Sequence, residues 1–577
     1  MTSKTPKFDE SLDKIFSGLS PHTRTCKQCV QLFNIFAEDI DFFKMLRVPP
    51  PTLCPLCRQQ RRFGHRIYFF PIFYKKTCAA LGHSEKVIAY YSNANPVKVY
   101  DDAYYHSDAW DAISFGKDYD LSRSFFKQWQ EFSSAIPRQT LFRDIASVAV
   151  EYTVSGFKSK NCYYVALPYY AEDVHYGFLP FHTKNAVDVS DTDNSESCYS
   201  SVSIDHCYRS SFCYESVNCM DSAFLYDCKN CSSCFGCTNL RNKQYYFFNE
   251  QLTKEEYKKR MRDIDLGKRS EVNKWYGLFE GVYISAIRKA VNNTRVENCL
   301  GDNLRESKNC YMSFRAVGGC ENLRYTAPAD RMANAMDATG AQSSFLYEVG
   351  GAIHAERALF STMIRTGRDV EYSMECNNCD YIFGCVGLRN KKFCIFNKQY
   401  SEGAYWTRID EIKTKMLANG EYGEFFPLAT SAAAYQDSSA SADFPLSEEE
   451  VARRGWHVKE REEGGSDLSK MTILTSEQVP DNISDVTDEI LKTPIMCERT
   501  GKPFRITPFE LGFYRTMRLP IPTVHPLERI KDLFKFRRPF RLFRYPCSKC
   551  GKDMNTSFDP ALKYKVYCEQ CYNTEVV

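Results

Sequence analysis

Two Cys-x-x-Cys pairs near each end of the chain supply the residue types that hold a structural metal ion. The first two are Cys26-Lys-Gln-Cys29 and Cys54-Pro-Leu-Cys57, and the last two are Cys547-Ser-Lys-Cys550 and Cys568-Glu-Gln-Cys571. Two tight turns that each offer two thiolates satisfy the tetrahedral coordination of zinc. The sequence therefore predicts one Zn2+ site at each end, about two per chain, with these eight cysteines as ligands.

Cys228, Cys231, Cys234 and Cys237 stand at three-residue intervals, close to the spacing that wraps an iron–sulfur cluster. They lie in a run, residues 207–242, that reads in six-residue blocks: CYRSSF, CYESVN, CMDSAF, LYDCKN, CSSCFG and CTNLRN. Neither a helix nor a single strand has this period, but a solenoid whose strands turn a corner every six residues does. Cysteine packs as a small hydrophobe in such a narrow core.

The solenoid is predicted to occur twice. The stretch 227–261 recurs as 375–409, at an offset of 148 residues. In the second copy Ile382 stands where the first has Cys234, and isoleucine cannot ligate a cluster although a core accepts it. The repeat therefore favours core packing over an iron–sulfur cluster or an adventitious metal. The expected fold is mainly β, a parallel β-helix (hexad solenoid) in two repeated blocks, flanked by small zinc-ribbon modules and a few helices.

The segment 33–62, FNIFAEDIDFFKMLRVPPPTLCPLCRQQRR, completes a recognisable pattern with the knuckle before it. A CxxC knuckle, an F-x-I strand, an aromatic pair, a proline-rich turn and a CPxCR knuckle follow in order. This pattern resembles the probable zinc-ribbon modules of bacteria, a treble-clef-like family. The resemblance implies a metal-stabilised binding fold and no catalytic activity.

The same pattern returns near the carboxyl end without its ligands. Aligning Cys26 with Cys497 places Thr500, His525 and Glu528 where the first ribbon has its other three cysteines, so only Cys497 and His525 remain as candidate ligands. The residues that do recur are Phe33, Ile35, Phe42, Arg47, Pro49, Pro51, Pro55 and Arg58, matched by Phe504, Ile506, Phe513, Arg518, Pro520, Pro522, Pro526 and Arg529.

A second ribbon follows each of these, and here the amino-terminal copy is the one that lacks cysteine ligands. The carboxy-terminal one keeps its four cysteines, whereas its counterpart keeps Cys78 and has Leu81, Asp101 and Tyr104 at the other ligand positions. Each end is thus predicted to be a duplicated two-ribbon module that retains one zinc. A ribbon that survives without its metal must be held by packing as well.

Two basic and aromatic segments occupy matching places in the two modules, residues 58–76 (RQQRRFGHRIYFFPIFYKK) and 529–545 (RIKDLFKFRRPFRLFRY). Arginines interleaved with aromatic rings suit phosphate contact and base stacking. They predict RNA or DNA binding, with a protein partner or a purely structural role as alternatives. The arginines assigned to nucleic acid are Arg58, Arg61, Arg62, Arg66, Arg537, Arg538, Arg541 and Arg544.

An enzymatic alternative depends on His206 and His354, which are equivalent in the two blocks. Hexad-solenoid acyltransferases, which the repeat resembles, use a histidine between coils as a general base. Each histidine, however, lies one residue before an inward position and is expected to point outward. No residue pattern supports a coenzyme A-transferase, and no small-molecule pocket is evident.

Composition argues against a secreted or membrane-spanning protein and against a general attraction for polyanions. The formal net charge of the 577 residues is +3, so no global field attracts a polyanion. The first residues lack the apolar stretch of a signal peptide, and no run of about 20 apolar residues predicts a membrane span. Twenty-six cysteines without an export signal favour a reducing, cytoplasmic location.

The organisation expected along the chain is a platform with a zinc module at each end. Residues 108–143 should include a helix that covers an open end of the solenoid, and the carboxy-terminal module should be tethered at a distance by a linker. The whole order resembles uncharacterised zinc-ribbon proteins of candidate-phylum bacteria. The predicted segments are an extension (1–25), a two-ribbon module (26–107), a capping helix (108–143), block 1 (144–249), a helical excursion (250–293), block 2 (294–400), a terminal helix (401–429), a linker with a short helix (430–493) and a second two-ribbon module (494–577).

Overall fold

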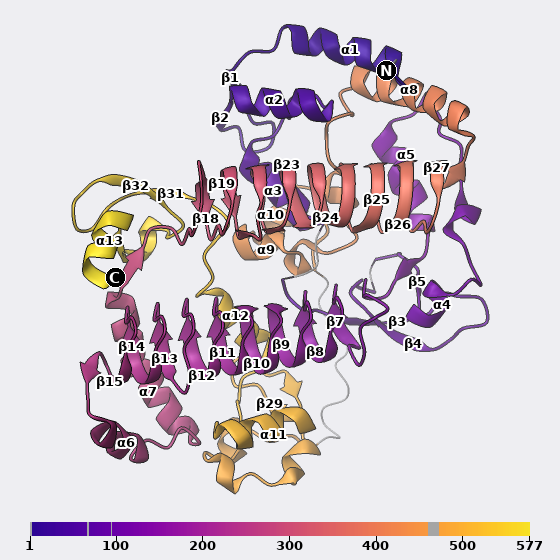
Figure 1. The fold of residues 1–577 in the computed structure, drawn as a ribbon. Coiled ribbons are helices and arrows are strands. Elements are labelled where there is room, and N and C mark those ends of the chain that lie inside the picture. Colours follow the sequence, from indigo (N-terminus) through magenta and orange to yellow (C-terminus); the bar gives the residue numbers. More distant parts are fainter. Residues whose placement is uncertain (1–2, 66–68, 94, 460–471) are drawn as a thin grey trace.

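A computed structural model describes residues 3–65, 69–93, 95–459 and 472–577. The chain is mainly β, and two large sheets of stacked, mostly parallel strands lie side by side along its length (Figure 1). We call the ten-stranded sheet sheet 1 and the eleven-stranded sheet sheet 2. Ion pairs such as Arg305 with Asp205, at 3.0 Å, join the two sheets.

Both sheets follow the order of the chain, apart from short strands beside the main path of sheet 2. Sheet 1 contains β7 (Tyr152–Val154), β8 (Lys160–Ala166), β9 (Glu172–Phe181), β10 (Lys184–Asp193), β11 (Glu196–Val202), β12 (Tyr208–Tyr214), β13 (Ala223–Tyr226), β14 (Ser232–Thr238), β15 (Gln244–Phe247) and β16 (Glu250–Gln251). Sheet 2 contains β18 (Leu300–Asp302), β19 (Lys308–Phe314), β20 (Ala316–Val317), β21 (Glu321–Arg324), β22 (Ala329–Asp330), β23 (Ala333–Ala341), β24 (Ser344–Leu359), β25 (Ile364–Glu371), β26 (Asn377–Phe383), β27 (Lys392–Ile395) and β28 (Lys398–Gln399). Only the closing pairs β15 with β16 and β27 with β28 are antiparallel.

Neighbouring strands are related by a 12-residue step, as in the pairing of Asn185 with Ser197 and of Asn218 with Asn230 through side-chain hydrogen bonds. The sequence predicted that the backbone turns a corner every six residues, but within each step it turns at shorter intervals. A left-handed residue recurs at every third position over long stretches, not every sixth, for example at Asn161 (φ 50°), Tyr164 (φ 53°) and Leu167 (φ 55°). This conformation is uncommon outside glycine. Hydrogen bonds to the preceding step stabilise it, such as that from Leu167 N–H to the Val154 carbonyl at 2.8 Å.

The residue after each left-handed position faces a narrow interior. In sheet 1 this interior is lined by buried small residues, including Cys228, Cys231, Cys234 and Cys237. Their thiols donate to backbone carbonyls, as Cys237 does to Phe235 at 3.2 Å. The interior of sheet 2 has Ala335, Val349, Val370 and Ile382 at comparable positions. Ile382, which aligns with Cys234, is therefore a buried core residue like that cysteine.

Four small hairpin-and-helix units surround the sheets, and we call them ribbons 1 to 4. Ribbon 1 contains β1 (His22–Thr25), β2 (Leu32–Ile35), α2 (Ala37–Leu46) and α3 (Pro55–Gly64), and ribbon 2 contains β3 (Tyr74–Thr77), β4 (Lys86–Ala89), β5 (Val99–Tyr100) and α4 (Asp102–His106). Ribbon 3 contains β29 (Ile495–Met496), β30 (Pro503–Phe504), α11 (Pro508–Met517) and α12 (Pro526–Phe534), and ribbon 4 contains β31 (Phe543–Pro546), β32 (Asp553–Thr556), β33 (Lys565–Tyr567) and α13 (Glu569–Val576).

The other helices are α1 (Pro6–Ser17), α5 (Phe125–Ala135), α6 (Lys254–Arg262), α7 (Arg269–Ser285), α8 (Glu402–Ala418), α9 (Ala440–Asp443) and α10 (Glu448–Arg453). Of these, α6 and α7 pack on sheet 1, α8 packs on sheet 2, and α1 packs on α8. Thr253 forms the predicted capping box with Glu256 at the start of α6. In the segment predicted to cover an open end, Phe125 of α5 contacts the rings of Tyr372 and Phe383 on the side of sheet 2. Ala112, earlier in the same segment, packs with the interior residues of sheet 2, and residues 112–115 contact its last strand, β28.

Residues 430–446 differ most from their prediction as a linker. Ser438, Ser439 and Ala440 are fully buried, and α9 lies against α3. Small side chains allow this segment to pass through a crowded interface. The serines and alanines that suggested a flexible linker are therefore small because they are packed. Residues 460–471, the middle of the expected flexible stretch, lie outside the described residues.

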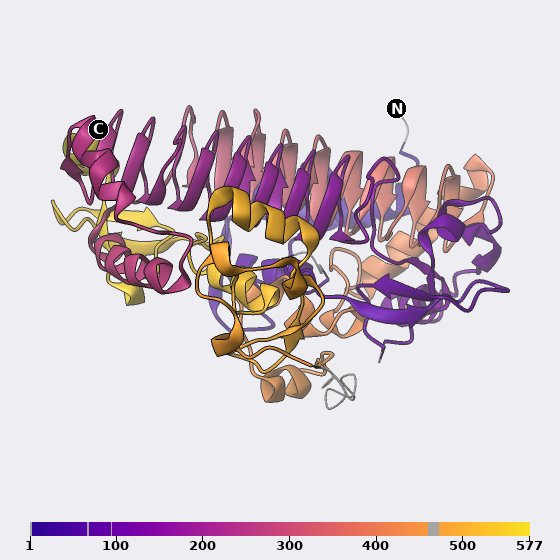
Figure 2. The ribbon, with the colours of Figure 1, turned by 90° about the horizontal axis from the view of Figure 1, so that it is seen from below.

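The first ribbons of the two modules dock on the sheets in a crossed manner. Ribbon 1 precedes sheet 1 in sequence but contacts sheet 2, where α3 packs on β23 and β24. Next to ribbon 2, Phe73 contacts the rings of Tyr152 and Tyr164 in sheet 1. Ribbons 3 and 4 follow sheet 2 but contact sheet 1, where α12 packs on β9 and β10. The helices of ribbon 3 lie across sheet 1 in the second view (Figure 2). The carboxy-terminal module is therefore docked, not tethered at a distance.

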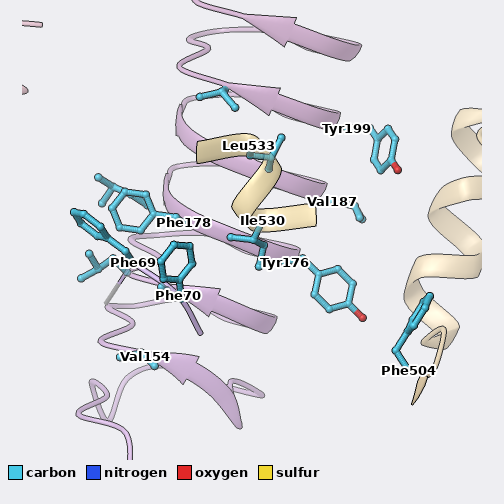
Figure 3. Packing of buried hydrophobic residues seen from close by; sticks show 14 of the residues in the cluster. Phe69, Phe70, Val154, Tyr176, Phe178, Val187, Tyr199, Phe504, Ile530 and Leu533 are labelled. Atoms are coloured by element: carbon cyan, nitrogen blue, oxygen red, sulfur yellow. The ribbon is translucent and has the colours of Figure 1, made fainter. Parts of the chain in front are cut away.

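The aromatic residues of the two basic segments enter a shared core. Figure 3 shows Ile530 and Leu533 of α12 over the strands of sheet 1, with Phe69 and Phe70 beside Phe178. Phe69 meets Phe178 with ring centroids 4.8 Å apart, edge to face. Aromatic rings in such a core carry much of the burial free energy, so these segments join the modules to the sheet.

Candidate metal centres

All four ribbons contain the same knuckle, built around the first ligand position. In each of them the backbone N–H of the third ligand position donates to the sulfur of the first cysteine. These bonds are Cys54 to Cys26 at 3.3 Å, Asp101 to Cys78 at 3.3 Å, His525 to Cys497 at 3.2 Å and Cys568 to Cys547 at 3.3 Å. The internal alignment read from the sequence is therefore also a structural equivalence.

Ribbon 1 brings its four predicted cysteines together. The sulfur atoms of Cys26, Cys29, Cys54 and Cys57 all lie within 4.8 Å of one another. The Cys29 and Cys54 sulfurs are 3.7 Å apart, which matches the edge of about 3.8 Å expected for a tetrahedron with zinc–sulfur bonds of about 2.3 Å. All but Cys29 are buried.

Ribbon 4 repeats this arrangement with Cys547, Cys550, Cys568 and Cys571, whose sulfurs also lie within 4.8 Å of one another. The Cys550 and Cys568 sulfurs are 3.9 Å apart. This cluster is more open, since Cys550 is exposed and only Cys547 is buried. All 26 cysteines of the chain are free thiols, so both clusters are available to a metal.

Helix starts make these thiols good ligands. Cys54 is the N-cap of α3, and Cys568 is the N-cap of α13. A helix amino terminus favours the thiolate form that binds metal. A hydrogen bond from Cys57 lowers the pKa of Cys54 to about 5. Burial raises the pKa of Cys547, but backbone N–H groups outweigh burial and lower it to about 6.

In ribbon 3 the ligand positions other than Cys497 make ordinary hydrogen bonds. His525 caps α12, and its Nδ1 accepts from the Leu527 N–H at 3.2 Å. Thr507 and Glu510 form a capping box at the start of α11. Among the described residues, Cys497 and His525 belong to no group of three or more ligand atoms. The knuckle is thus closed by polar contacts within the protein.

The cysteine run inside sheet 1 is not grouped for metal binding in the described part of the chain either. Successive thiols donate to carbonyls, as Cys231 does to Lys229 at 3.3 Å and Cys234 to Ser232 at 3.4 Å. Burial raises the pKa of Cys228 well above its usual range, whereas hydrogen bonds from Cys219 and Cys228 lower that of Cys231, so the four thiols do not share a tendency to form thiolates. These observations fit the core-packing interpretation.

The arginines predicted to bind nucleic acid in the first segment face inward. Arg58, Arg61 and Arg62 are 2%, 7% and 2% exposed. Arg58 and Arg62 pair with Asp337 of β23 at 2.7 and 2.9 Å, and Arg61 pairs with Glu348 of β24 at 2.8 Å. Burial lowers the pKa of Arg58, but Asp337, Tyr347 and Glu348 together outweigh burial, and the net direction is upward. Arg66 lies outside the described residues.

The second segment behaves in the same way, apart from its last two arginines. Arg537 pairs with the buried Asp443, and Arg538 contacts Glu215 at 2.8 Å and Asp302 at 3.2 Å. Arg541 donates to the Asp443 carbonyl. Arg544, on β31, is exposed. Arg541 is partly exposed. The other described arginines of the two segments are buried against carboxylates, so in this structure they hold the modules on the sheets.

The carboxylates that receive these arginines were missed from the sequence. Arg529 of ribbon 3, the counterpart of Arg58, pairs with Asp188 of β10 at 3.2 Å. Asp188 and Asp337 occupy equivalent left-handed positions, with φ of 55° and 53°. At the offset of 148 residues Asp188 aligns with Met336, one residue before Asp337, so the two internal alignments match both ends of this contact only after a one-residue shift.

A second docking contact is duplicated in the same way. Asp39 of α2 accepts from Arg324 at 2.6 Å and from the Tyr325 hydroxyl at 3.3 Å. Its counterpart Glu510 of α11 accepts from the Tyr176 hydroxyl at 2.8 Å. Each first ribbon is thus fixed to a sheet by the same pair of contacts, whether or not it keeps four cysteines.

The histidines of the enzymatic alternative do not form a site. His206 is exposed and its Nδ1 lies 2.6 Å from the neighbouring Asp205. His354 is also exposed. Both have left-handed backbones one residue before an inward position, which directs their side chains away from the core as expected.

No protein-family model, no curated protein and no solved structure matches this chain. The resemblance to bacterial zinc-ribbon proteins therefore stays a prediction. Within the described residues, none of the helices is long and apolar enough to traverse a membrane.

Proposed function

We propose that this protein is a non-enzymatic, zinc-stabilised scaffold that holds two β-solenoid blocks side by side. The observation that carries the proposal is the pair of four-cysteine clusters, one in each module, at the tips of ribbons that are themselves docked on the sheets. Zinc bound by four thiolates has no open coordination position and serves structure. Its role here is to hold the ribbon tip rigid for binding.

A solenoid of 12-residue coils accounts for the strand order, the pairing step and the narrow interior together. With a left-handed residue at every third position, a coil has four corners and four inward side chains. Small inward residues such as Cys207 and Ser210 suit such a coil because its interior is too narrow for larger side chains. The result is a long, rigid platform.

The arginine clusters support a fixed placement of the modules on this platform. Three buried arginines of ribbon 1 meet Asp337, Glu348 and Glu424. Removing one partner from a buried pair costs about 3 to 5 kcal/mol because the other charge stays desolvated. The docking geometry is therefore strongly specified, as a scaffold requires.

The surface around the ribbon 1 knuckle favours a protein partner over RNA or DNA. Val30 and Leu32 at the hairpin tip are 72% and 71% exposed, and Leu56 beside the cluster is 43% exposed. Apolar side chains gathered on a rigid tip bind another protein more readily than a phosphate backbone. Nucleic-acid binding is the second candidate, and the exposed Arg544 of ribbon 4 is the observation that favours it.

Metal analysis of the full-length protein tests the structural proposal. After dialysis against a mild chelator we expect two tightly bound zinc ions per chain. Cys29→Ser and Cys550→Ser should each remove one, and the double variant should remove both. Iron with visible absorbance, or tight zinc that both variants retain, would contradict the proposal.

Affinity purification with the native cell extract tests the partner class. A protein partner should be retained after nuclease treatment and at high salt, and Leu32→Glu should weaken it. A matched control is Leu562→Glu, because Leu562 is also exposed, at 53%, but lies in ribbon 4. Retention that disappears with nuclease, or that falls steeply with salt as counterion release predicts, would favour nucleic acid instead.

A further inference from the structure

Ribbon 2 departs from the other three in the length of its knuckle. In ribbons 1 and 4 the first cysteine donates its backbone N–H to the residue five positions on, Cys26 to Gln31 and Cys547 to Lys552. In ribbon 2 the same bond runs from Cys78 to Glu85, at 3.0 Å. The loop is therefore two residues longer, and the extra length carries His83.

The longer loop brings new donor atoms to the place where the cysteines were lost. One ligand atom each from Cys78, His83, Glu85 and Asp101 lies within 4.8 Å of all the others. The Asp101 Oδ2 is 3.7 Å from the Cys78 sulfur and 3.5 Å from the His83 Nδ1. These separations are close to the edges of about 3.3 to 3.8 Å expected around a tetrahedral zinc ion.

Asp101 occupies the position of Cys568 in the intact copy. Both residues are the N-cap of the following helix, and both donate their backbone N–H to the first cysteine at 3.3 Å. The Asp101 Oδ1 is used as the cap, since it accepts from the N–H groups of Ala103 and Tyr104. The other oxygen, Oδ2, is left facing Cys78 and His83.

The two remaining ligand positions of the intact copy are vacated in ribbon 2. Leu81, at the position of Cys550, is 95% exposed and takes no part. Tyr104, at the position of Cys571, packs edge to face on the His83 ring with centroids 4.9 Å apart. That contact orients the imidazole toward Asp101 and Glu85. Two donors were thus lost from the knuckle, and two were gained from its loop.

We propose that Cys78, His83, Glu85 and Asp101 form a third metal site, for Zn2+ or a divalent ion of similar softness such as Co2+. Thiolate, imidazole and carboxylate donors in one tetrahedral group suit such ions. The site goes beyond the two four-cysteine centres of the proposed function and does not depend on them.

The donor set makes this site more labile than the four-cysteine centres. Side-chain exposure is 32% for His83, 47% for Glu85 and 21% for Asp101, so water and chelators reach the ion. The His83 Nδ1 and the Glu85 Oε1 are 2.7 Å apart, shorter than a ligand edge, and the exposed Glu85 side chain must open slightly as the ion enters. We therefore expect the metal at this site to exchange readily, unlike the tightly bound zinc of the four-cysteine centres.

Metal counting on the full-length protein separates the two kinds of site. Protein equilibrated with excess zinc and then freed of unbound metal by gel filtration should hold three equivalents, and two after dialysis against a mild chelator. His83→Ala should hold two before the chelator step. His22→Ala is the matched control, because His22 is an exposed histidine on the ribbon 1 hairpin outside the clusters, and it should hold three.

Asp101→Asn and cobalt give independent readings. Asparagine keeps the helix cap but loses the anionic donor, so this variant should also hold two equivalents while remaining folded. The third cobalt ion should show about a quarter of the thiolate charge-transfer absorbance of the others, since it has one thiolate ligand. Wild-type protein that binds only two equivalents, or His83→Ala that still binds three, would overturn the proposal. Failure of the four-cysteine centres would appear instead in the Cys29 and Cys550 variants.

Discussion

Ribbons 1 and 3 have the same fold and the same docking contacts, but only ribbon 1 has a four-cysteine cluster. Each places an arginine of its second helix on an aspartate of a sheet, Arg58 on Asp337 and Arg529 on Asp188. In ribbon 3 the third ligand position is His525, whose Nδ1 accepts a hydrogen bond from the Leu527 N–H at 3.2 Å. The comparison teaches that the same ribbon fold and the same docking contacts occur with and without four cysteines at the knuckle.

The largest effect should follow from breaking the docking pairs that the two ribbons share. Arg529→Ala should lower the free energy of unfolding by about 3 to 5 kcal/mol, because the buried Asp188 loses its arginine. Arg58→Ala should cost less than Arg529→Ala but more than an exposed pair, because Arg62 still pairs with Asp337. Chemical denaturation measures this change. Arg123→Ala is the control, since Arg123 and Glu131 form a pair whose side chains are 46% and 59% exposed, and it should cost less than about 1 kcal/mol. Equal costs at all three positions would remove docking as the explanation.

The next effect concerns the ligands that distinguish the two ribbons. Cys29→Ser should remove one tight zinc ion and destabilise the protein by about 2 kcal/mol, less than in an undocked zinc module, because packing persists. Thr500→Ser, at the same position of ribbon 3, should change neither the metal content nor the stability measurably. Zinc analysis and thermal denaturation of the same samples provide the check.

The comparison can also be reversed. The triple variant Thr500→Cys, His525→Cys and Glu528→Cys supplies ribbon 3 with the ligands of ribbon 1 around Cys497. Because the knuckle geometry is already present, it should bind one additional zinc ion tightly, and its cobalt form should show four-thiolate absorbance. If the extra ion does not bind, the two knuckles are less alike than their hydrogen bonds indicate.

A smaller effect should appear as the pH dependence that His525 contributes in ribbon 3. Burial lowers the pKa of His525 from 6.5 to about 4, so the folded state favours the neutral ring that accepts from Leu527. The contribution is therefore fully present above pH 6.5 and lost as the pH falls toward 4. After allowing for its partial exposure we expect about 1 kcal/mol. The difference in stability between the wild type and His525→Asn across this range measures it, and a flat difference would contradict it.

The smallest effect is expected inside sheet 1. Cys234→Ser places a hydroxyl in a site where the thiol already donates to a carbonyl at 3.4 Å, and should cost only about 1 kcal/mol. Metal content and visible absorbance should not change. A loss of bound metal would show that the cysteine run is more than a packed interior.

Local patterns were sufficient to predict much of this molecule. The Cys-x-x-Cys pairs identified both four-cysteine clusters because a knuckle is a short turn whose geometry depends on a few adjacent residues. The repeat of small residues from Cys207 predicted stacked parallel strands, and Ile382 correctly indicated packing. The corner spacing was predicted as six instead of three, because residues between the thiols, such as Ser210, are also inward but are not distinctly apolar.

Only the tertiary structure decided what the charged and small residues do. Arg58 and Arg538 look like phosphate ligands in the sequence, because no neighbouring residue indicates that they pair with Asp337 and Glu215, hundreds of residues away in the chain. Ser438 and its neighbours resemble a linker, yet they are buried where the modules meet the sheets. Charge and small size are compatible with both solvent and interface, and only the partner that the fold brings near determines which environment a side chain occupies.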